Sequence, residues 1–216
     1  MPLYTADALV LRTYKLGEAD RIVVFLTRDR GKKRGVAKGA RRPRSRFTGA
    51  LEPLTEVRVA YFEKERRELV GLNYAETQRS PLVLSTSDAL GCVSYFAELL
   101  DEWAQEADAD DRLYRLGASM LDALAAGTPV EPLARYFEYW LLRLQGVYPE
   151  SRGTLSDAAM AFLAGSRTVA PQHVGSVPAG AQVLRELENV HRTLIAMHLE
   201  KTLKSDRVLR DLRRHA

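Results

Sequence analysis

The hydrophobic pattern of this chain changes its period once, near Ser85. Upstream of that point, apolar residues form short continuous runs or alternate with polar residues, as β-strands do. Residues 55–61, for example, place Val57, Val59 and Tyr61 on one face. Downstream, apolar residues recur every three or four positions, as on one face of a helix. We therefore predict an α+β protein, with an N-terminal OB-fold β-barrel in residues 1–80 and an all-helical C-terminal domain in residues 81–216.

Five short strands are expected in the first domain. The first two are nearly continuous apolar runs, which are typical of buried strands. Gly31 can supply the positive φ that the hairpin turn before the third strand needs. The expected strands cover residues 8–11, 22–26, 32–38, 55–61 and 70–74. Five strands in about 75 residues fit a small barrel such as the OB-fold, although the count alone fits other small β folds too.

The second domain is expected to contain five helices and a short sixth one. N-cap candidates at residues 85–88 precede the first helix, which should turn Val93, Phe96, Leu100 and Trp103 inward. The fifth helix should turn its own apolar stripe inward: Val183, Leu187, Val190, Leu194 and Met197. The other helices are expected over residues 111–127, 129–146, 156–164 and 205–214, with the fifth over residues 181–201.

Charge is strongly segregated along the chain. The formal net charge is +4, but residues 1–80 carry 18 basic against 10 acidic side chains, whereas residues 81–160 carry 5 against 13. Residues 28–46 alone hold ten basic side chains and one acidic side chain, Asp29. Such a density of one sign is typical of a surface that binds phosphates, because counterions released from nucleic acid favour binding. The segregation indicates two modules with different partners.

The basic residues of the first domain are therefore the candidate nucleic-acid contacts. Residues 39–49 indicate a flexible loop, and Gly35 and Gly39 would let backbone amides approach phosphates. Tyr14 and Phe47 could stack on bases, but they more simply end a strand and cover a barrel end. Charge alone leaves open a solvated charged face, RNA or an anionic membrane. The candidate DNA-binding residues are Arg12, Lys32, Lys33, Arg34, Lys38, Arg41, Arg42, Arg44 and Arg46.

Several kinds of site are disfavoured. Cys92 is the only cysteine, which excludes an intrachain disulfide and a four-cysteine zinc site. His191 and His198 are separated by about 10.5 Å along a helix, too far to share one metal ion, and are read as surface or packing residues. No phosphate-cradling loop of the Walker type and no nucleophile elbow occur. No apolar run approaches the ~20 residues that span a bilayer. We expect no metal, cofactor, enzymatic activity or membrane span, and a cytoplasmic location.

Two stretches of the first domain are distinctive as sequences. They are Gly17-Glu18-Ala19-Asp20-Arg21-Ile22 and Ala37-Lys38-Gly39-Ala40-Arg41-Arg42-Pro43. With Ser45-Arg46-Phe47 and Gly49-Ala50-Leu51, they resemble the N-terminal part of the RecO family of bacterial recombination mediators. The similarity is most specific in the first 55 residues. It resumes weakly at residues 95–100, 136–142 and 203–209, so that it extends nearly from end to end.

The resemblance implies a DNA repair function for an OB-fold joined to a helical domain. It implies binding of single- and double-stranded DNA and annealing of complementary strands without ATP, in the cytoplasm at the nucleoid. It further implies work with RecR to load RecA onto single strands coated by single-stranded DNA-binding protein. Many family members carry a four-cysteine zinc module after a Gly-x-Tyr-Pro stretch. Here no cysteine follows that stretch at residues 146–149, so zinc is not carried over.

The resemblance also supports a partner site on the helical domain. The tail of single-stranded DNA-binding protein is acidic with a hydrophobic end, and needs an apolar pocket flanked by cations. Candidate flanking residues are Arg143, Arg192 and Lys201. Aromatic residues such as Trp103 and Trp140 could line the pocket, but are most simply core. The alternative function is an RNA-binding OB module with a helical protein-interaction scaffold, which a strand-annealing assay would distinguish.

Overall fold

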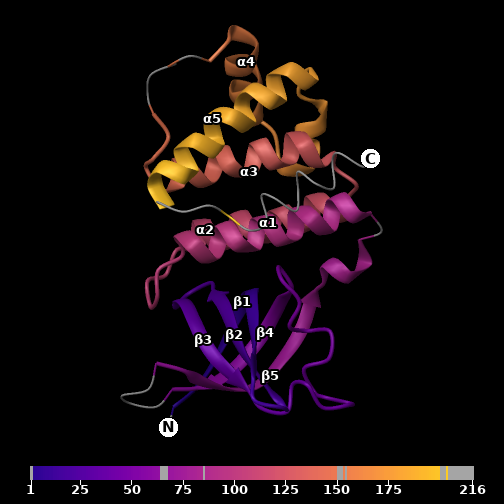
Figure 1. Ribbon diagram of the computed structural model, residues 1–216, viewed down its shortest axis with the longest axis vertical. Coiled ribbons are helices and arrows are strands. Elements are labelled where there is room, and N and C mark those ends of the chain that lie inside the picture. Colours follow the sequence, from indigo (N-terminus) through magenta and orange to yellow (C-terminus); the bar gives the residue numbers. More distant parts are fainter. Residues whose placement is uncertain are drawn as a thin grey trace.

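The computed structural model describes residues 2–63, 68–84, 86–149, 153, 155–199 and 203. Five strands form a closed barrel in the order β1-β2-β3-β5-β4, and the helices follow it along the chain (Figure 1). All neighbouring strands are antiparallel except β3 and β5, which are parallel. The strands are β1 (Leu3–Leu16), β2 (Asp20–Thr27), β3 (Gly31–Ala37), β4 (Glu56–Phe62) and β5 (Val70–Arg79). The predicted barrel and its five strands are confirmed, with β1 much longer than expected.

The middle of β1 and the second half of β2 are buried on both faces, which explains their continuous apolar runs. On β2, Val23 and Phe25 point into the barrel, whereas Val24 and Leu26 pack with the helices. On β1, Leu9 packs with the helices in the same way. Because the two domains share one hydrophobic core along these strands, burial of apolar area stabilises the barrel and the helical domain together.

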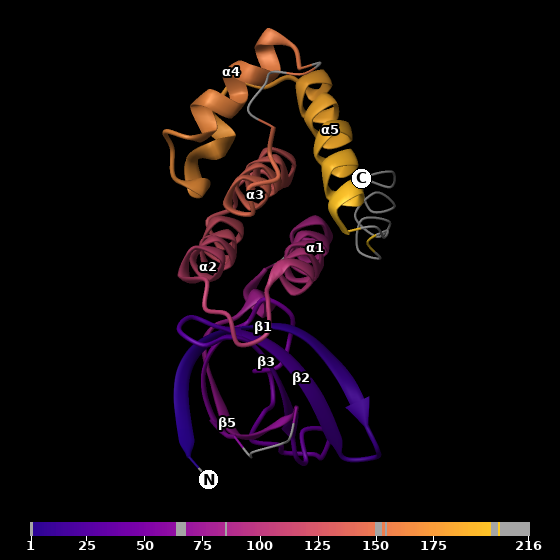
Figure 2. The same ribbon diagram turned by 90° about the vertical axis from the view of Figure 1, so that its left-hand side faces the viewer.

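The helical domain is stacked in layers on one side of the barrel (Figure 2). Helices α1 and α2 lie next to the barrel, α3 forms the next layer, and α4 and α5 lie farthest away. The helices are α1 (Ser87–Trp103), α2 (Asp111–Ala125), α3 (Val130–Leu144), α4 (Asp157–Ser166) and α5 (Ala181–Leu199). Short 3₁₀ segments lie at η1 (Pro81–Val83) and η2 (Pro171–Ser176). Side chains of Thr86, Asp110 and Ser156 cap α1, α2 and α4.

The positions of the five expected helices are confirmed, but one predicted core residue is wrong. Met197 is 72% exposed, whereas His191 and Ile195 are buried. The buried stripe of α5 follows Leu187, His191 and Ile195 at intervals of four residues. At about 100° per residue, Met197 therefore lies on the opposite side of the helix from Ile195. The expected short helix at residues 205–214 lies outside the described residues.

Candidate nucleic-acid interface

Two of the candidate DNA-binding residues lie against helix α1. The guanidinium of Arg12 is 3.2 Å from the carboxylate of Asp101, and it also faces Glu98 and Glu102 at 3.7 and 3.8 Å. The ammonium of Lys32 donates to the carbonyl of Asp101 over 2.6 Å. These contacts join the barrel to the helical domain, so both cations are engaged within the protein. Their contact with DNA stays a prediction.

A second set of polar contacts also joins the barrel to the helical domain, on the other side of the interface between them. Arg79 of β5 pairs with Glu56 of β4 and with Asp122 of α2, and the hydroxyl of Tyr114 donates to Glu56 over 2.6 Å. Burial alone would raise the pKa of Glu56, but the bonds from Arg79 and Tyr114 outweigh it and lower that pKa. Arg28 likewise pairs with Asp111 at 2.8 Å. Some of the basic side chains of the barrel therefore form ion pairs with acidic side chains of the helical domain, so the charge segregation is not only for binding other molecules.

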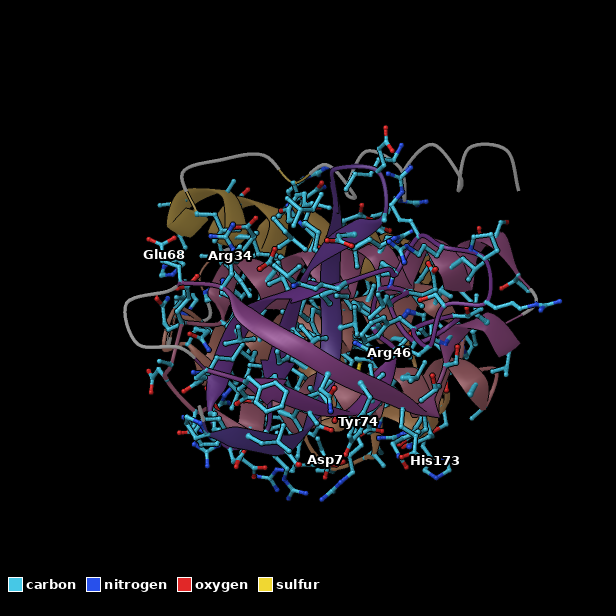
Figure 3. All side chains as sticks on the ribbon, turned by 90° about the horizontal axis from the view of Figure 1, so that it is seen from below. Asp7, Arg34, Arg46, Glu68, Tyr74 and His173 are labelled. Atoms are coloured by element: carbon cyan, nitrogen blue, oxygen red, sulfur yellow. The ribbon has the colours of Figure 1, made fainter. Side chains whose placement is uncertain are left out.

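The remaining candidates fall into two groups according to their partners. Lys33 pairs with Glu63 at 2.8 Å, and Arg41 donates to the carbonyl of Gly17 over 2.9 Å. A second group is exposed and has no ion pair with any residue that the structure describes: Arg34, Lys38, Arg42, Arg44 and Arg46. Arg34 and Arg46 lie well apart across the barrel when it is viewed from below (Figure 3). The unpaired positive charge is therefore not confined to one point of the barrel, and an extended nucleic-acid backbone could contact more than one of these cations.

The basic segment after β3 is a chain of turns rather than an open loop. Backbone hydrogen bonds connect Gly39 to Arg42, Arg42 to Ser45, and Ser45 to Thr48. The side chain of Phe47 is buried in the barrel core, as the simpler interpretation held. The guanidinium of Arg46 lies 5.0 Å from the centre of the Phe47 ring. The segment thus holds its cations outward by anchoring an aromatic residue inward, and the expectation of a flexible loop is not what the backbone shows.

The two glycines of this region serve the fold rather than phosphate. A Cβ at Gly35 would lie 2.1 Å from Leu72 Cδ1, so this glycine lets β3 and β5 approach each other. The amide of Gly39 already donates to the carboxylate of Asp20 over 2.8 Å. Gly39 also has a positive φ of 71°, which disfavours other residues. Asp20 and Arg41 therefore explain parts of the two distinctive sequence stretches: they tie the β1–β2 turn to the segment after β3.

A pocket of about 220 Å³ lies where β3, the end of β4 and the α1–α2 connection meet. Its charged lining is balanced between three cations and three carboxylates: Lys32, Lys33, Arg34, Glu63, Glu68 and Glu106. An isolated phosphate gains little from such a lining, because the carboxylates oppose it. The pocket is therefore a poor candidate for the nucleic-acid site.

The candidate partner residues are placed on separate helices. Arg143 of α3 donates to the Tyr139 hydroxyl over 3.0 Å and lies 5.9 Å from the centre of the Trp140 ring. Arg192 of α5 bonds to Asn189, one turn earlier on its own helix. Lys201 lies outside the described residues. Trp103, Phe137 and Tyr139 are buried core residues, whereas Trp140 is only partly buried.

Sequence reasoning missed a buried polar cluster between α1, α3 and α5. Glu138 accepts hydrogen bonds from Tyr95 over 2.8 Å and contacts His191 Nδ1 at 3.0 Å and Arg135 at 2.9 Å. Burial alone would raise the pKa of Glu138, but the charge of Arg135 and the bonds from His191 and Tyr95 lower it. The spacing of Arg135 and Glu138 was visible in the sequence, but their burial was not.

The described residues offer neither a metal site nor a membrane-spanning helix. No three His, Cys, Asp or Glu side chains there lie close enough together to hold a metal ion. Cys92, the one cysteine that a zinc module could use, is buried in α1. Of the helices in the described part of the chain, none combines the length and apolar character that crossing a membrane requires.

Comparison with known proteins identifies relatives of both domains. The family model "Recombination protein O N terminal" matches residues 1–81, and "Recombination protein O C terminal" matches residues 84–154. The DNA repair protein RecO of Koribacter versatilis (strain Ellin345) is 40% identical over 149 residues, which are 68% of this chain and 61% of that protein. That of Anaeromyxobacter sp. (strain K) is 39% identical over 142 residues, or 65% and 56%.

The extent of the match differs between relatives. The chain spans less than two thirds of the length of these first two proteins. In contrast, the DNA repair protein RecO of Nocardioides sp. (strain ATCC BAA-499 / JS614) is 31% identical over 251 aligned positions, which cover 94% of this chain and 97% of that protein. The similarity to this last relative therefore extends over most of both domains.

Proposed function

The chain belongs to the RecO family of DNA repair proteins, and on that premise we propose that it is a recombination mediator which binds single- and double-stranded DNA and anneals complementary strands without ATP. The observation that carries the proposal is the group of exposed cations on the barrel, Arg34, Lys38, Arg42, Arg44 and Arg46, which have no carboxylate partner among the described residues. Cations without partners can exchange their counterions for phosphates at little cost.

The helical domain supports the protein-binding part of the same proposal. We propose that RecR and the tail of single-stranded DNA-binding protein bind there, and that RecA is loaded indirectly. Arg143 supports this assignment, because it lies over the partly exposed ring of Trp140. A cation beside an apolar surface fits an acidic peptide with a hydrophobic end. We further propose that the protein acts at the nucleoid and is not itself an enzyme.

Annealing of two complementary strands is expected to proceed at full rate without any nucleotide. The reason is that binding neutralises strand charge and brings complementary bases together, which requires no hydrolysis. The measurement is the rate of duplex formation from two labelled 40-mers, with and without ATP and Mg²⁺. An absolute requirement for ATP would contradict the proposal.

The same assay separates DNA from the RNA alternative. Two complementary RNA strands of the same sequence serve as the matched substrate. The proposal expects DNA annealing at physiological salt. Annealing of RNA but not of DNA would favour the alternative, an RNA-binding module with a protein-interaction scaffold. All tests use the whole chain, because the two domains share a hydrophobic core and either half alone would expose an apolar face.

A further inference from the structure

A row of four residues crosses the outer face of the barrel at one level. Tyr14 of β1 is paired with Ile22 of β2, Ile22 is paired with Val36 of β3, and Val36 is paired with Gly71 of β5. Directly paired residues point to the same face of a sheet, with side chains about 5 Å apart. Residues one position away, such as Val23 and Ala37, belong to the barrel interior. The row therefore points outward.

This row is apolar but belongs to neither core. Tyr14 is 45% exposed, Ile22 and Val36 are partly exposed, and none of the three is in either hydrophobic cluster. A Cβ at Gly71 would meet nothing within 4 Å, so open space lies at that end of the row. Helix α1 contacts β1 at Arg12, and the C-terminal end of β1 extends away from the helices (Figure 2). Among the residues that the structure describes, none of the hydrophobic clusters covers this row, and it forms an apolar strip on the barrel surface.

Cations flank the Val36 end of the strip, and they favour an anionic occupant. Arg34 lies on the same face as Val36, two residues before it, and Lys38 follows two residues after it. The segment that carries Lys38 and Arg42 is held against the β1–β2 hairpin by two hydrogen bonds. The amide of Gly39 donates to the carboxylate of Asp20, and the guanidinium of Arg41 donates to the carbonyl of Gly17. An apolar strip between cations fits single-stranded nucleic acid, whose bases stack on rings while its phosphates contact the cations. An uncharged protein surface would gain nothing from those cations.

We propose that Tyr14, with Ile22 and Val36 beside it, is a platform on which bases of a bound single strand of DNA stack. The inference rests on the DNA binding proposed above and adds a specific place for the bases. In this arrangement Lys38 contacts a phosphate next to the stacked bases, whereas Arg34 also faces the carboxylates that line the pocket described above. Gly71 leaves room for the strand to pass over β5.

The platform also assigns a different role to Arg12. Its guanidinium is held by Asp101 and approaches the Tyr14 hydroxyl at 3.4 Å. Its charge is therefore already matched by acids of α1, and Arg12 is a positioning residue for the Tyr14 ring. Arg12→Gln is expected to weaken binding to single-stranded DNA while leaving the salt dependence unchanged. A true phosphate contact would instead flatten the slope of log affinity against log salt by about 0.7.

The decisive experiment compares a normal strand with one that has no bases. Fluorescence anisotropy measures binding of a thymidine 20-mer and of an abasic backbone of equal length and charge. Tyr14→Ala is expected to weaken binding of the 20-mer about tenfold to 100-fold, the usual loss for one stacked base, and to leave abasic binding unchanged. Tyr14→Phe keeps the ring but loses the hydroxyl that Arg12 contacts, so its affinity for the 20-mer should match that of Arg12→Gln and stay well above that of Tyr14→Ala.

Tyr74→Ala is the matched control, because Tyr74 is a similarly exposed tyrosine (38%) of β5 that is paired with Ala60 of β4 and not with a member of the row. It should bind both strands like the wild type. If Tyr14→Ala lost the same affinity for both strands, or lost no affinity for either, the proposed platform would be wrong. The second result would indicate that the strip binds a protein partner instead. A wild type that binds neither strand would overturn the proposed function itself, so the two failures are distinguishable. Thermal melts establish that each variant is folded.

Discussion

Replacing Lys38, Arg42, Arg44 and Arg46 together with glutamine is expected to flatten the salt dependence of single-strand binding and to abolish annealing at physiological salt. These four cations are exposed and have no ion pair within the described part of the chain. If each contacts one phosphate, the slope of log affinity against log salt should flatten by about 2.8, at 0.7 per contact. A fourfold increase in salt should then weaken the wild type about 50-fold more than the variant. Salt titrations of both proteins measure the difference.

The matched control removes four exposed arginines from the helical domain: Arg112, Arg115, Arg167 and Arg185. It changes the net charge by the same amount, so it tests whether position or total charge decides binding. The control should retain nearly the full salt slope. An unchanged slope in a well-folded variant of the basic segment would show that these four cations are only a solvated face. Arg41 is left intact in this design, because it holds the β1–β2 turn through Gly17.

Much of the fold could be predicted from the periodicity of apolar residues, because that periodicity is set by local backbone geometry. The strands and helices therefore lie where the period predicts them. The prediction placed Met197 in the core because apolar residues at intervals of three and four can follow more than one line around a helix. Only packing against the rest of the protein decides which of these lines is buried. Similarly, the amino-acid sequence does not reveal that the side chain of Leu72 on β5 lies against Gly35 on β3.

The candidate site could be predicted only as a region. A run of basic residues indicates a phosphate-binding surface, but it does not tell which side chains are already engaged. Arg12 and Lys32 meet Asp101, which is more than 65 residues away in the chain, so only the folded structure separates them from the unpaired cations. The apolar strip is predicted only in part by the sequence, which offers Tyr14 as a possible base-stacking residue. Its neighbours Ile22 and Val36 could not be assigned without the strand register.

Replacing Glu138 with alanine is expected to destabilise the helical domain by about 3 kcal/mol, because it leaves the buried cation Arg135 with the more distant carboxylate of Glu188, at 3.5 Å, in place of its nearest one. For a chain of this size the melting temperature should fall by roughly 10 °C. Glu131→Ala is the control on the same helix, since Glu131 is exposed. The double variant Arg135→Met/Glu138→Leu removes both charges and should recover much of the loss. A double variant no more stable than Glu138→Ala would contradict this explanation.

The pH dependence of stability gives an independent test of the same cluster. The pKa of Glu138 is lowered from its ordinary value of 4.5, since the charge of Arg135 and the bonds from His191 and Tyr95 outweigh the effect of burial. A carboxyl whose folded pKa lies below its unfolded value contributes stability above the unfolded pKa and loses it as the pH falls through the folded pKa. The difference in the free energy of unfolding between the wild type and Glu138→Gln should therefore be largest near neutral pH and shrink below about pH 4.5. Denaturant titrations at pH 7 and at pH 3.5 measure both values. A difference that stays constant with pH would mean that Glu138 stabilises α3 by packing alone, and not through its charge.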